Sequence, residues 1–363
     1  MLVLAAARMP CLPILRSFTK VLGVVIGALV ITAPVAAQPT PEEVFAAVVH
    51  VEAKIPVGAR TAPSLGTERR GSGVVIDDDG LILTIGYLIL EASEVTVTDS
   101  QGTTLPAEII AYDYATGFGL LRTTQSLDIA PLTFGVSGDA EEGDPVLVIS
   151  YGGREAVQVS QVVSRRDFAG YWEYLLENAI LTSPPYPQFA GAALIGPAGK
   201  LIGIGSLFVR NSLGNDSSTA GNMFVPIDAL KPILSDLITD GRTSVPRRPW
   251  LGVYLEQLHG HILVSRLAKE GPAEGAGIEV GDIMLKVAGQ SLDDLADFYR
   301  KIWTLGNTGV EVPLEVLRKS KVIQITVPSG NRYDWLRLNP SKDSTQIKAQ
   351  ISPSRTAKTP IAG

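Results

Sequence analysis

The sequence predicts a mainly β protein with two domains. Its 363 residues are enough for two separate hydrophobic cores. The 36 glycines and 24 prolines are typical of a globular chain with many turns. From residue 71 to residue 225, short strand-like runs alternate with turn signals. This repeated pattern favours barrels or sandwiches over a sheet built from βαβ units.

The first element is an N-terminal leader, residues 1–37. Three basic residues precede an apolar run at positions 21–37, VLGVVIGALVITAPVAA, and small residues stand just before Gln38. This arrangement predicts a secretory signal peptide that is cleaved after residue 37. A retained membrane anchor is the alternative, although this run is slightly short for a membrane span. Met9 is an alternative start of the chain.

The chain that follows the leader is acidic and has no cysteine. Removing the three basic residues of the leader leaves 28 basic against 37 acidic residues, a net charge of −9. No basic run or basic patch with interleaved aromatic residues occurs, so nucleic acid is not an expected partner. The single cysteine, Cys11, lies in the leader, and the mature chain can therefore form neither disulfides nor thiolate metal sites. The periplasm is the expected location.

The first domain is expected to span residues 40–241 and to begin with a short helix. Thr40 is a candidate N-cap, with Glu43 three residues on, and the helix continues into a strand by residue 50. A loop over residues 56–70 leads into the strand runs.

The end of the first domain and the second domain follow in order. Residues 227–241 predict one amphipathic helix that ends at glycine, followed by a linker over residues 242–249. The second domain is expected at residues 250–338, with an amphipathic helix over 293–305. The tail, residues 339–363, is polar and aperiodic, which predicts disorder.

Several motifs follow one another in the order found in HtrA/Deg-type trypsin-like proteases. They are GSGVVIDDDGLILT, VTVTDSQGTTLPAEIIAYDYATGFGLLR, GDPVLVIS, FAGAALIGPAGKLIGI, MFVPIDALKPIL and WLGV. The chain resembles this family over about residues 42–335. The resemblance implies a trypsin-like double β-barrel of two six-stranded barrels, with the active site between them, followed by an α+β PDZ domain. It also implies a homo-oligomer, since family members commonly form trimers.

The three positions that match the family's catalytic triad hold other residues. The histidine position in LILTIGYLIL is Tyr87, the aspartate position in YATGFGLLR is Gly117, and the serine position in QFAGAAL is Ala190. The chemistry needs a nucleophile, a base and a carboxylate that orients the base. A tyrosine titrates near 10, far from the neutral range of a tuned histidine base. Glycine and alanine supply neither a carboxylate nor a nucleophile, so no catalytic residue is expected.

A substitute hydrolytic site finds little support among the remaining residues. The three histidines are His50, His259 and His261, so none lies between residues 51 and 258. A Ser-Lys dyad would need Ser183 beside a lysine. The only lysines between the leader and the linker are Lys54, Lys200 and Lys231.

No motif predicts a metal or another cofactor. The run Asp77-Asp78-Asp79 is followed at once by glycine and a strand, so it lacks the spaced ligands of a calcium loop. It is expected to be a solvated hairpin turn. His259 and His261 flank Gly260 and are expected to be exposed turn residues, because two histidines alone are too few for a metal site.

The second domain resembles a bacterial PDZ domain most clearly in GPAEGAGIEVGDIMLKVAGQ, residues 271–290. PDZ domains bind an extended peptide as an added strand and hold its terminal carboxylate on free backbone amides. The resemblance places the carboxylate loop at Trp250, Leu251, Gly252 and Val253, where glycine allows close approach of the ligand. Phe298 and Ile302 face the same way on the expected helix and are candidate groove residues, although such a stripe is mostly core.

These observations favour an exported, proteolytically inactive relative of the HtrA/Deg proteases. It is expected to bind unfolded or C-terminal peptide segments and to act as a chaperone-like, adaptor or regulatory protein. One alternative is an active serine endopeptidase of periplasmic protein quality control that uses an unrecognised site. Another is a non-catalytic structural subunit that joins an active HtrA-like paralogue.

Overall fold

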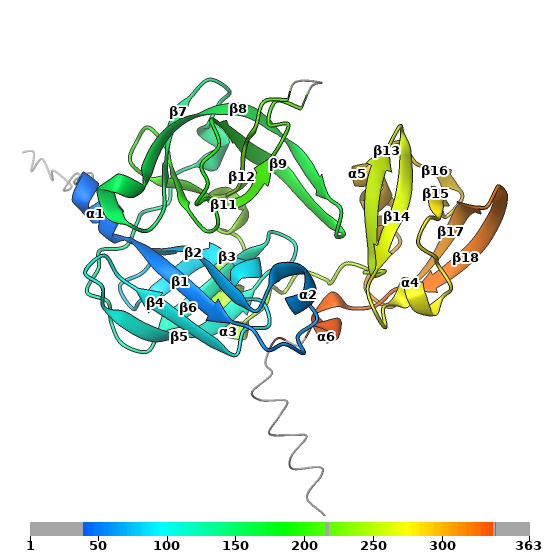
Figure 1. Cartoon of the computed structure of the whole chain (residues 1–363), viewed down its shortest axis with the longest axis horizontal. Helices are drawn as coiled ribbons and strands as arrows, with labels where there is room; N and C mark the ends of the chain where they lie inside the picture. The colour runs from blue at the N-terminus through cyan, green and yellow to red at the C-terminus, as the bar shows by residue number, and fades with distance from the viewer. Residues whose placement is uncertain (1–38, 215–217, 337, 339–363) are drawn as a thin grey trace, which may run out of the picture. The chain divides into compact units, whose positions relative to one another are not determined.

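The computed structural model describes residues 39–214, 218–336 and 338 of the chain. The signal peptide and the disordered tail expected from the sequence lie outside these residues. Strands dominate the described residues, which confirms the mainly β prediction (Figure 1). Among the described helices, none is both long and apolar enough to span a membrane.

The first barrel is closed by six strands in the order β1-β2-β3-β6-β5-β4. All neighbouring strands in it are antiparallel, and β1 closes the ring by pairing with β4. The strands are β1 (Val48–Lys54), β2 (Glu68–Val75), β3 (Leu81–Ile85), β4 (Glu94–Thr98), β5 (Thr104–Tyr112) and β6 (Phe118–Thr123).

The second barrel is closed by six strands in the order β10-β11-β12-β9-β8-β7. Its longest pair, β8 and β9, forms a hairpin that extends to Gly170 and Tyr174. The strands are β7 (Pro145–Ile149), β8 (Val157–Gly170), β9 (Tyr174–Ser183), β10 (Ala193–Ile195), β11 (Leu201–Val209) and β12 (Gly221–Pro226). The two closed barrels confirm the double β-barrel that the resemblance implies.

Short helices flank the barrels. The first has the predicted capping box, in which Thr40 and Glu43 each accept a hydrogen bond from the backbone of the other. The α-helices are α1 (Pro41–Ala46), α2 (Ala62–Leu65) and α3 (Leu234–Asp240). The 3₁₀ turns are η1 (Gly86–Leu88), η2 (Ser137–Asp139), η3 (Gly153–Ala156) and η4 (Ile227–Ala229).

The single helix predicted over residues 227–241 is wrong. The structure has a 3₁₀ turn, η4, and then a separate helix, α3, which begins at Leu234. Pro232 lies between the two and has no amide hydrogen to donate, so a continuous helix would lose a hydrogen bond there. The predicted end at Gly241 is confirmed, since its amide caps the helix in the left-handed conformation.

The third sheet has the order β13-β14-β15-β17-β18, with β16 paired to β15. Strand β13 therefore lies at an edge of this sheet. Helix α5, predicted over 293–305, begins at Leu295 and packs against β13 and β15. The elements are β13 (Val253–Leu258), β14 (His261–Leu267), α4 (Pro272–Gly275), β15 (Ile283–Val287), β16 (Gln290–Ser291), α5 (Leu295–Thr304), β17 (Glu311–Arg318), β18 (Lys321–Pro328) and α6 (Arg332–Trp335).

Buried apolar side chains form three clusters. The largest includes Phe118 of the first barrel and Met223 of the second, so it continues from one barrel to the other. A smaller cluster surrounds Phe224 inside the second barrel. The third lies in the β13–β18 sheet beneath α5, and it also includes Leu175 from β9. A side chain of the second barrel thus belongs to the core of the second domain.

Candidate functional site

The three positions matched to the triad lie close to the contact between the barrels. Tyr87 belongs to η1, directly after β3, and Gly117 precedes β6, which pairs with β3. The Tyr87 hydroxyl donates to Ser206 O at 2.9 Å, which reaches β11 of the second barrel. The loop of Ala190 meets the same strand, because Gly191 N donates to Gly205 O at 2.8 Å. The fold therefore brings these three loops together.

The Tyr87 side chain has a structural partner and is poorly suited to act as a base. Burial raises the pKa of its hydroxyl well above the usual value. Its proton is directed at the carbonyl of Ser206. At neutral pH the group is therefore a hydrogen-bond donor that joins the two barrels.

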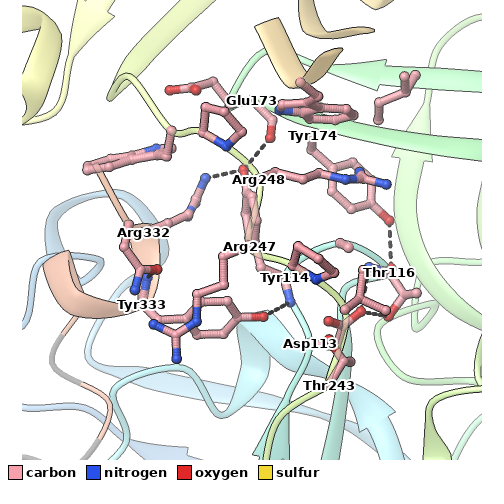
Figure 2. Close-up of a pocket in the computed structure, with 18 of the residues that line it drawn as sticks. Asp113, Tyr114, Thr116, Glu173, Tyr174, Thr243, Arg247, Arg248, Arg332 and Tyr333 are labelled. Atoms are coloured by element: carbon pink, nitrogen blue, oxygen red, sulfur yellow. Dashed lines mark hydrogen bonds between the residues drawn. The ribbon is translucent and has the colours of Figure 1, made fainter. Parts of the chain in front are cut away.

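Gly117 has a backbone conformation that favours glycine. Its φ is +86°, and an added Cβ atom would lie 3.4 Å from the Tyr174 hydroxyl. Asp113, four residues earlier, is a carboxylate in the same turn. Its Oδ2 atom accepts from the amide of Thr116 at 2.8 Å and from its hydroxyl at 2.6 Å. This carboxylate is therefore engaged within its own turn (Figure 2).

The loop of Ala190 is held by polar contacts on both sides. Ser72 N of β2 donates to Ala190 O at 2.8 Å, across the two barrels. The side chain of Gln188 accepts through Oε1 from the Ser150 hydroxyl at 2.9 Å and from the Tyr186 hydroxyl at 3.2 Å. These hydroxyls are directed at an amide oxygen, which is not a general base.

His50 is the histidine that comes nearest to this region in the strand register. It pairs with Ser72 across β1 and β2, and its ring stacks on Tyr151 with centroids 3.8 Å apart. Burial lowers the pKa of His50. Its Nε2 atom is buried and has no hydrogen-bond partner among the described residues. The Ser72 hydroxyl instead accepts from Tyr151 N at 3.1 Å, so serine and histidine are not hydrogen-bonded to each other.

The Ser-Lys pairing considered from the sequence is not formed. Ser183 donates to Ala220 O at 3.0 Å. Lys54 pairs with Glu94 at 2.9 Å, and Lys231 donates to Gly135 O at 2.7 Å. Lys200 is exposed and lies in the turn between β10 and β11, directly before β11 begins. The Ser183 hydroxyl and the lysine amines therefore do not form the hydrogen-bonded pair that a Ser-Lys dyad requires.

The acidic run at residues 77–79 forms the turn between β2 and β3. Asp77 Oδ1 accepts from the amides of Asp79 and Leu81 at 3.0 and 2.7 Å. Arg122 lies 3.6 Å from the Asp77 carboxylate. Within the described ranges, no three His, Asp or Glu side chains are grouped closely enough to hold a metal ion.

The predicted carboxylate loop, residues 250–253, leads directly into the edge strand β13. Gly252 has φ +80°, so glycine is required by the backbone conformation itself, as well as by any close approach of a ligand. The side chains of Leu251 and Val253 are buried in the third cluster. Trp250 packs its ring against Trp335 at 5.1 Å between centroids. The side chains of this loop are therefore packed within the fold.

A carboxylate from the second barrel occupies this loop. Glu173 Oε2 accepts from Leu251 N at 2.9 Å, and Oε1 accepts from Gly252 N at 2.6 Å and Val253 N at 2.9 Å. Glu173 lies between β8 and β9 and is 3 % exposed. Convergent backbone amides form a concave site that can bind a carboxylate. The loop therefore has the geometry of an anion site.

The candidate groove residues of α5 lie in the core beneath this loop. Phe298 and Ile302 are buried in the third cluster, as is Leu295. The cluster also includes Leu175, two residues after the bound carboxylate. The helix stripe is therefore mostly core, and it surrounds one side chain from outside the second domain.

Sequence reasoning missed Glu173 and Tyr299. Tyr299, on α5, donates from its hydroxyl to Gly170 O at 2.7 Å and accepts from Glu173 N at 3.1 Å. The contact joins residues about 80 to 130 positions apart, which no local pattern encodes. The one local signal is the aromatic, acidic segment YWEY at positions 171–174, at the tip of a long hairpin.

The Glu173 carboxyl predicts a pH dependence of stability. Burial raises its pKa to about 7, against the opposing effects of the loop amides and of Arg332. Between pH 4.5 and 7 the folded chain therefore keeps a proton that the unfolded chain has released. The raised pKa therefore adds to the free energy of unfolding. This added stability is complete below pH 4.5 and is lost as the pH rises through 7, a loss of about 3 kcal/mol.

Glu173→Gln removes the titrating group and supplies the reference for this measurement. We expect the unfolding free energy of the wild type, relative to the variant, to fall between pH 4.5 and pH 8. Urea denaturation at each pH, followed by tryptophan fluorescence, measures the difference. Parallel pH profiles for the two proteins would contradict the raised pKa.

Two families match separate parts of the chain. Residues 71–204 match the trypsin-like peptidase domain, and residues 249–328 match the PDZ domain. The first segment contains all three positions matched to the triad. The second begins one residue before the carboxylate loop.

Several relatives and solved structures resemble the chain. A probable periplasmic serine endoprotease, DegP-like, of Halomonas elongata is 30 % identical over 290 residues, which cover 74 % of this chain and 57 % of the relative. The serine endoprotease DegS of Haemophilus influenzae is 28 % identical, and the match covers 71 % of this chain and 76 % of DegS. The HtrA-type protease AlgW with a decapeptide has a similar fold, with a TM-score of 0.50, 22 % identity and coverage of 81 % of this chain and 99 % of that one. The chain thus spans little more than half of the DegP-like relative.

Proposed function

Because this chain is a homologue of the HtrA, DegP and DegS proteins, with a trypsin-like peptidase domain followed by a PDZ domain, we propose that it is an exported peptide-binding protein without hydrolytic activity. The observation that carries this proposal is the loop at residues 251–253. Its three amides converge on one carboxylate, the group at the end of every polypeptide. The proposed ligands are unfolded or C-terminal segments of other proteins.

The vacated triad supports binding without cleavage. Tyr87 is a partly buried hydrogen-bond donor, Gly117 carries no side chain, and Ala190 carries no nucleophile. A chain that holds peptides without cutting them suits a chaperone-like, adaptor or regulatory role. The trimeric assembly implied by the resemblance is part of the proposal.

Export rests on the leader and on the relatives. Residues 1–37 have the charge and hydropathy pattern of a signal peptide, and the DegP-like relative carries the word periplasmic in its name. We therefore propose a periplasmic location for the mature chain.

Peptide binding can be tested with one matched pair of ligands. A fluorescein-labelled peptide, Gly-Tyr-Trp-Leu, is prepared with a free C-terminal carboxylate and with a C-terminal amide. We expect the free acid to bind about tenfold or more tightly than the amide, because the amide loses charge-assisted hydrogen bonds to the loop. Fluorescence anisotropy with the mature protein measures both affinities. Equal affinities would exclude the loop as the carboxylate site.

A further inference from the structure

The β8–β9 turn, residues 170–173 of the second barrel, contacts β13, the loop that precedes it and helix α5. We propose that this turn is an internal ligand of the PDZ groove, which a peptide with a free terminal carboxylate and an aliphatic last residue must displace. The proposal deepens the proposed function and rests on it. It adds a regulatory property, because the binding site is closed by the chain itself.

The turn contacts the edge strand as an added strand would. Leu255 N of β13 donates to Tyr171 O at 2.8 Å. Two residues further along the turn, the Glu173 carboxylate meets the amides of the loop that precedes β13. Backbone bonding to the edge strand combined with a carboxylate on the loop is the pattern of peptide capture by strand addition.

Helix α5 supplies the opposite wall of the groove. The Tyr299 hydroxyl bridges the turn, since it donates to Gly170 O and accepts from Glu173 N at 2.7 and 3.1 Å. Arg300, the next residue of the helix, forms an ion pair with Asp167 of β8. The turn is thus held between strand and helix, where a peptide would lie.

Leu175 indicates which side chain the groove accepts. It is 5 % exposed and lies in the same apolar cluster as Leu251, Phe298 and Ile302. A ligand that replaces the turn leaves this space to be filled, and an unfilled cavity in a core is destabilising. An aliphatic last residue next to the terminal carboxylate meets this requirement.

Two further side chains hold the turn from outside the groove. Tyr114 and Arg332 point toward each other beside the backbone of Glu173 (Figure 2). The Tyr114 hydroxyl donates to Trp172 O at 2.6 Å, and Arg332 Nη1 donates to the same oxygen at 2.8 Å. Displacement must break these contacts too, so the closed state is expected to lower the apparent affinity for peptide substantially.

Glu173→Gln tests the internal ligand directly in the full mature chain. The amide keeps the size of the side chain, but it has one acceptor oxygen and places an NH₂ group among three donors. We expect the free-acid peptide Gly-Tyr-Trp-Leu to bind this variant roughly 10- to 100-fold more tightly than the wild type. Glu177→Gln is the matched control, because Glu177 is an exposed residue of the same hairpin. It is expected to leave the affinity unchanged.

The outcomes separate this proposal from the one on which it rests. Binding of equal strength by wild type and Glu173→Gln overturns the internal ligand and leaves peptide binding intact. Failure of all three proteins to bind the peptide overturns both.

Hydrogen exchange on the wild type gives a second test that needs no variant. With saturating peptide, we expect exchange of the Glu173 amide to rise about tenfold or more, because its acceptor on Tyr299 is lost. The amides of residues 251–253 should stay protected, since a new carboxylate replaces the old one. Peptide binding with an unchanged Glu173 amide would overturn displacement.

Discussion

We expect the purified mature protein to hydrolyse casein about a millionfold more slowly than a relative that has a complete triad. The three groups of the triad act as a unit, and loss of one of them already removes most of the catalysis. At the three positions that the resemblance matches to the triad, this chain has Tyr87, Gly117 and Ala190. The residual rate would come from binding and backbone contacts alone.

The geometry gives the physical reason for this expectation. A base must have a pKa near the working pH, whereas burial moves the pKa of Tyr87 upward, away from it. Installing Asp at position 117 would also be strained, because Gly117 has φ +86° and faces the Tyr174 hydroxyl. Restoring Ser at position 190 alone is therefore not expected to create an enzyme.

Three serine variants serve as controls for this prediction. They are the Ser→Ala changes at Ser72, Ser150 and Ser183, whose hydroxyls lie in the barrels. A fluorophosphonate probe should label neither the wild type nor the variants. Labelling together with casein cleavage, both abolished by one Ser→Ala change, would show an active endopeptidase and refute the proposed absence of hydrolysis.

We expect Arg69→Ala to lower the unfolding free energy by about 3 kcal/mol or more. Arg69 is 5 % exposed, and its guanidinium donates to Tyr87 O at 2.7 Å, Leu90 O at 3.0 Å and Thr61 Oγ1 at 2.9 Å. Burial lowers its pKa to about 10, against the opposing charge of Glu91. The variant would leave these buried acceptors without the guanidinium donor.

Arg70→Ala is the matched control, since it removes the same side chain from the neighbouring residue. Arg70 pairs with Glu52 at 2.8 Å, but its side chain is 68 % exposed. An exposed pair contributes little, and we expect a loss within about 1 kcal/mol. Urea denaturation of both variants measures the contrast. Similar losses would show that the contacts of Arg69 add nothing to stability.

The sequence was sufficient for the architecture because the strand–turn pattern and the order of the motifs are local features. The sequence-based prediction of secondary structure failed where one missing hydrogen atom ends a helix. Pro232 breaks the predicted helix through its missing amide hydrogen. The loop predicted over residues 56–70 contains helix α2 and the start of β2, and the buried Arg69 is hidden there among polar residues that suggest exposure.

Some residues of the candidate site could likewise be proposed from the sequence, and others could not. The loop at residues 250–253 and the three positions matched to the triad could be proposed from the sequence because each lies within a short motif. Glu173 could not, because its partners are about 80 residues away and a lone glutamate on a hairpin predicts an exposed side chain. Its burial depends on how two domains meet, which single-sequence patterns do not report.

In the proposed closed state, the covalent link between the β8–β9 turn and the groove sets how the protein responds to its own concentration. A tethered competitor has a fixed effective concentration, so diluting the protein does not loosen it. The free peptide concentration at which half of the sites are occupied is the dissociation constant for the open groove divided by the fraction of molecules that are open. The protein would then bind scarce peptide ends weakly, and its occupancy would rise gradually as such ends accumulate.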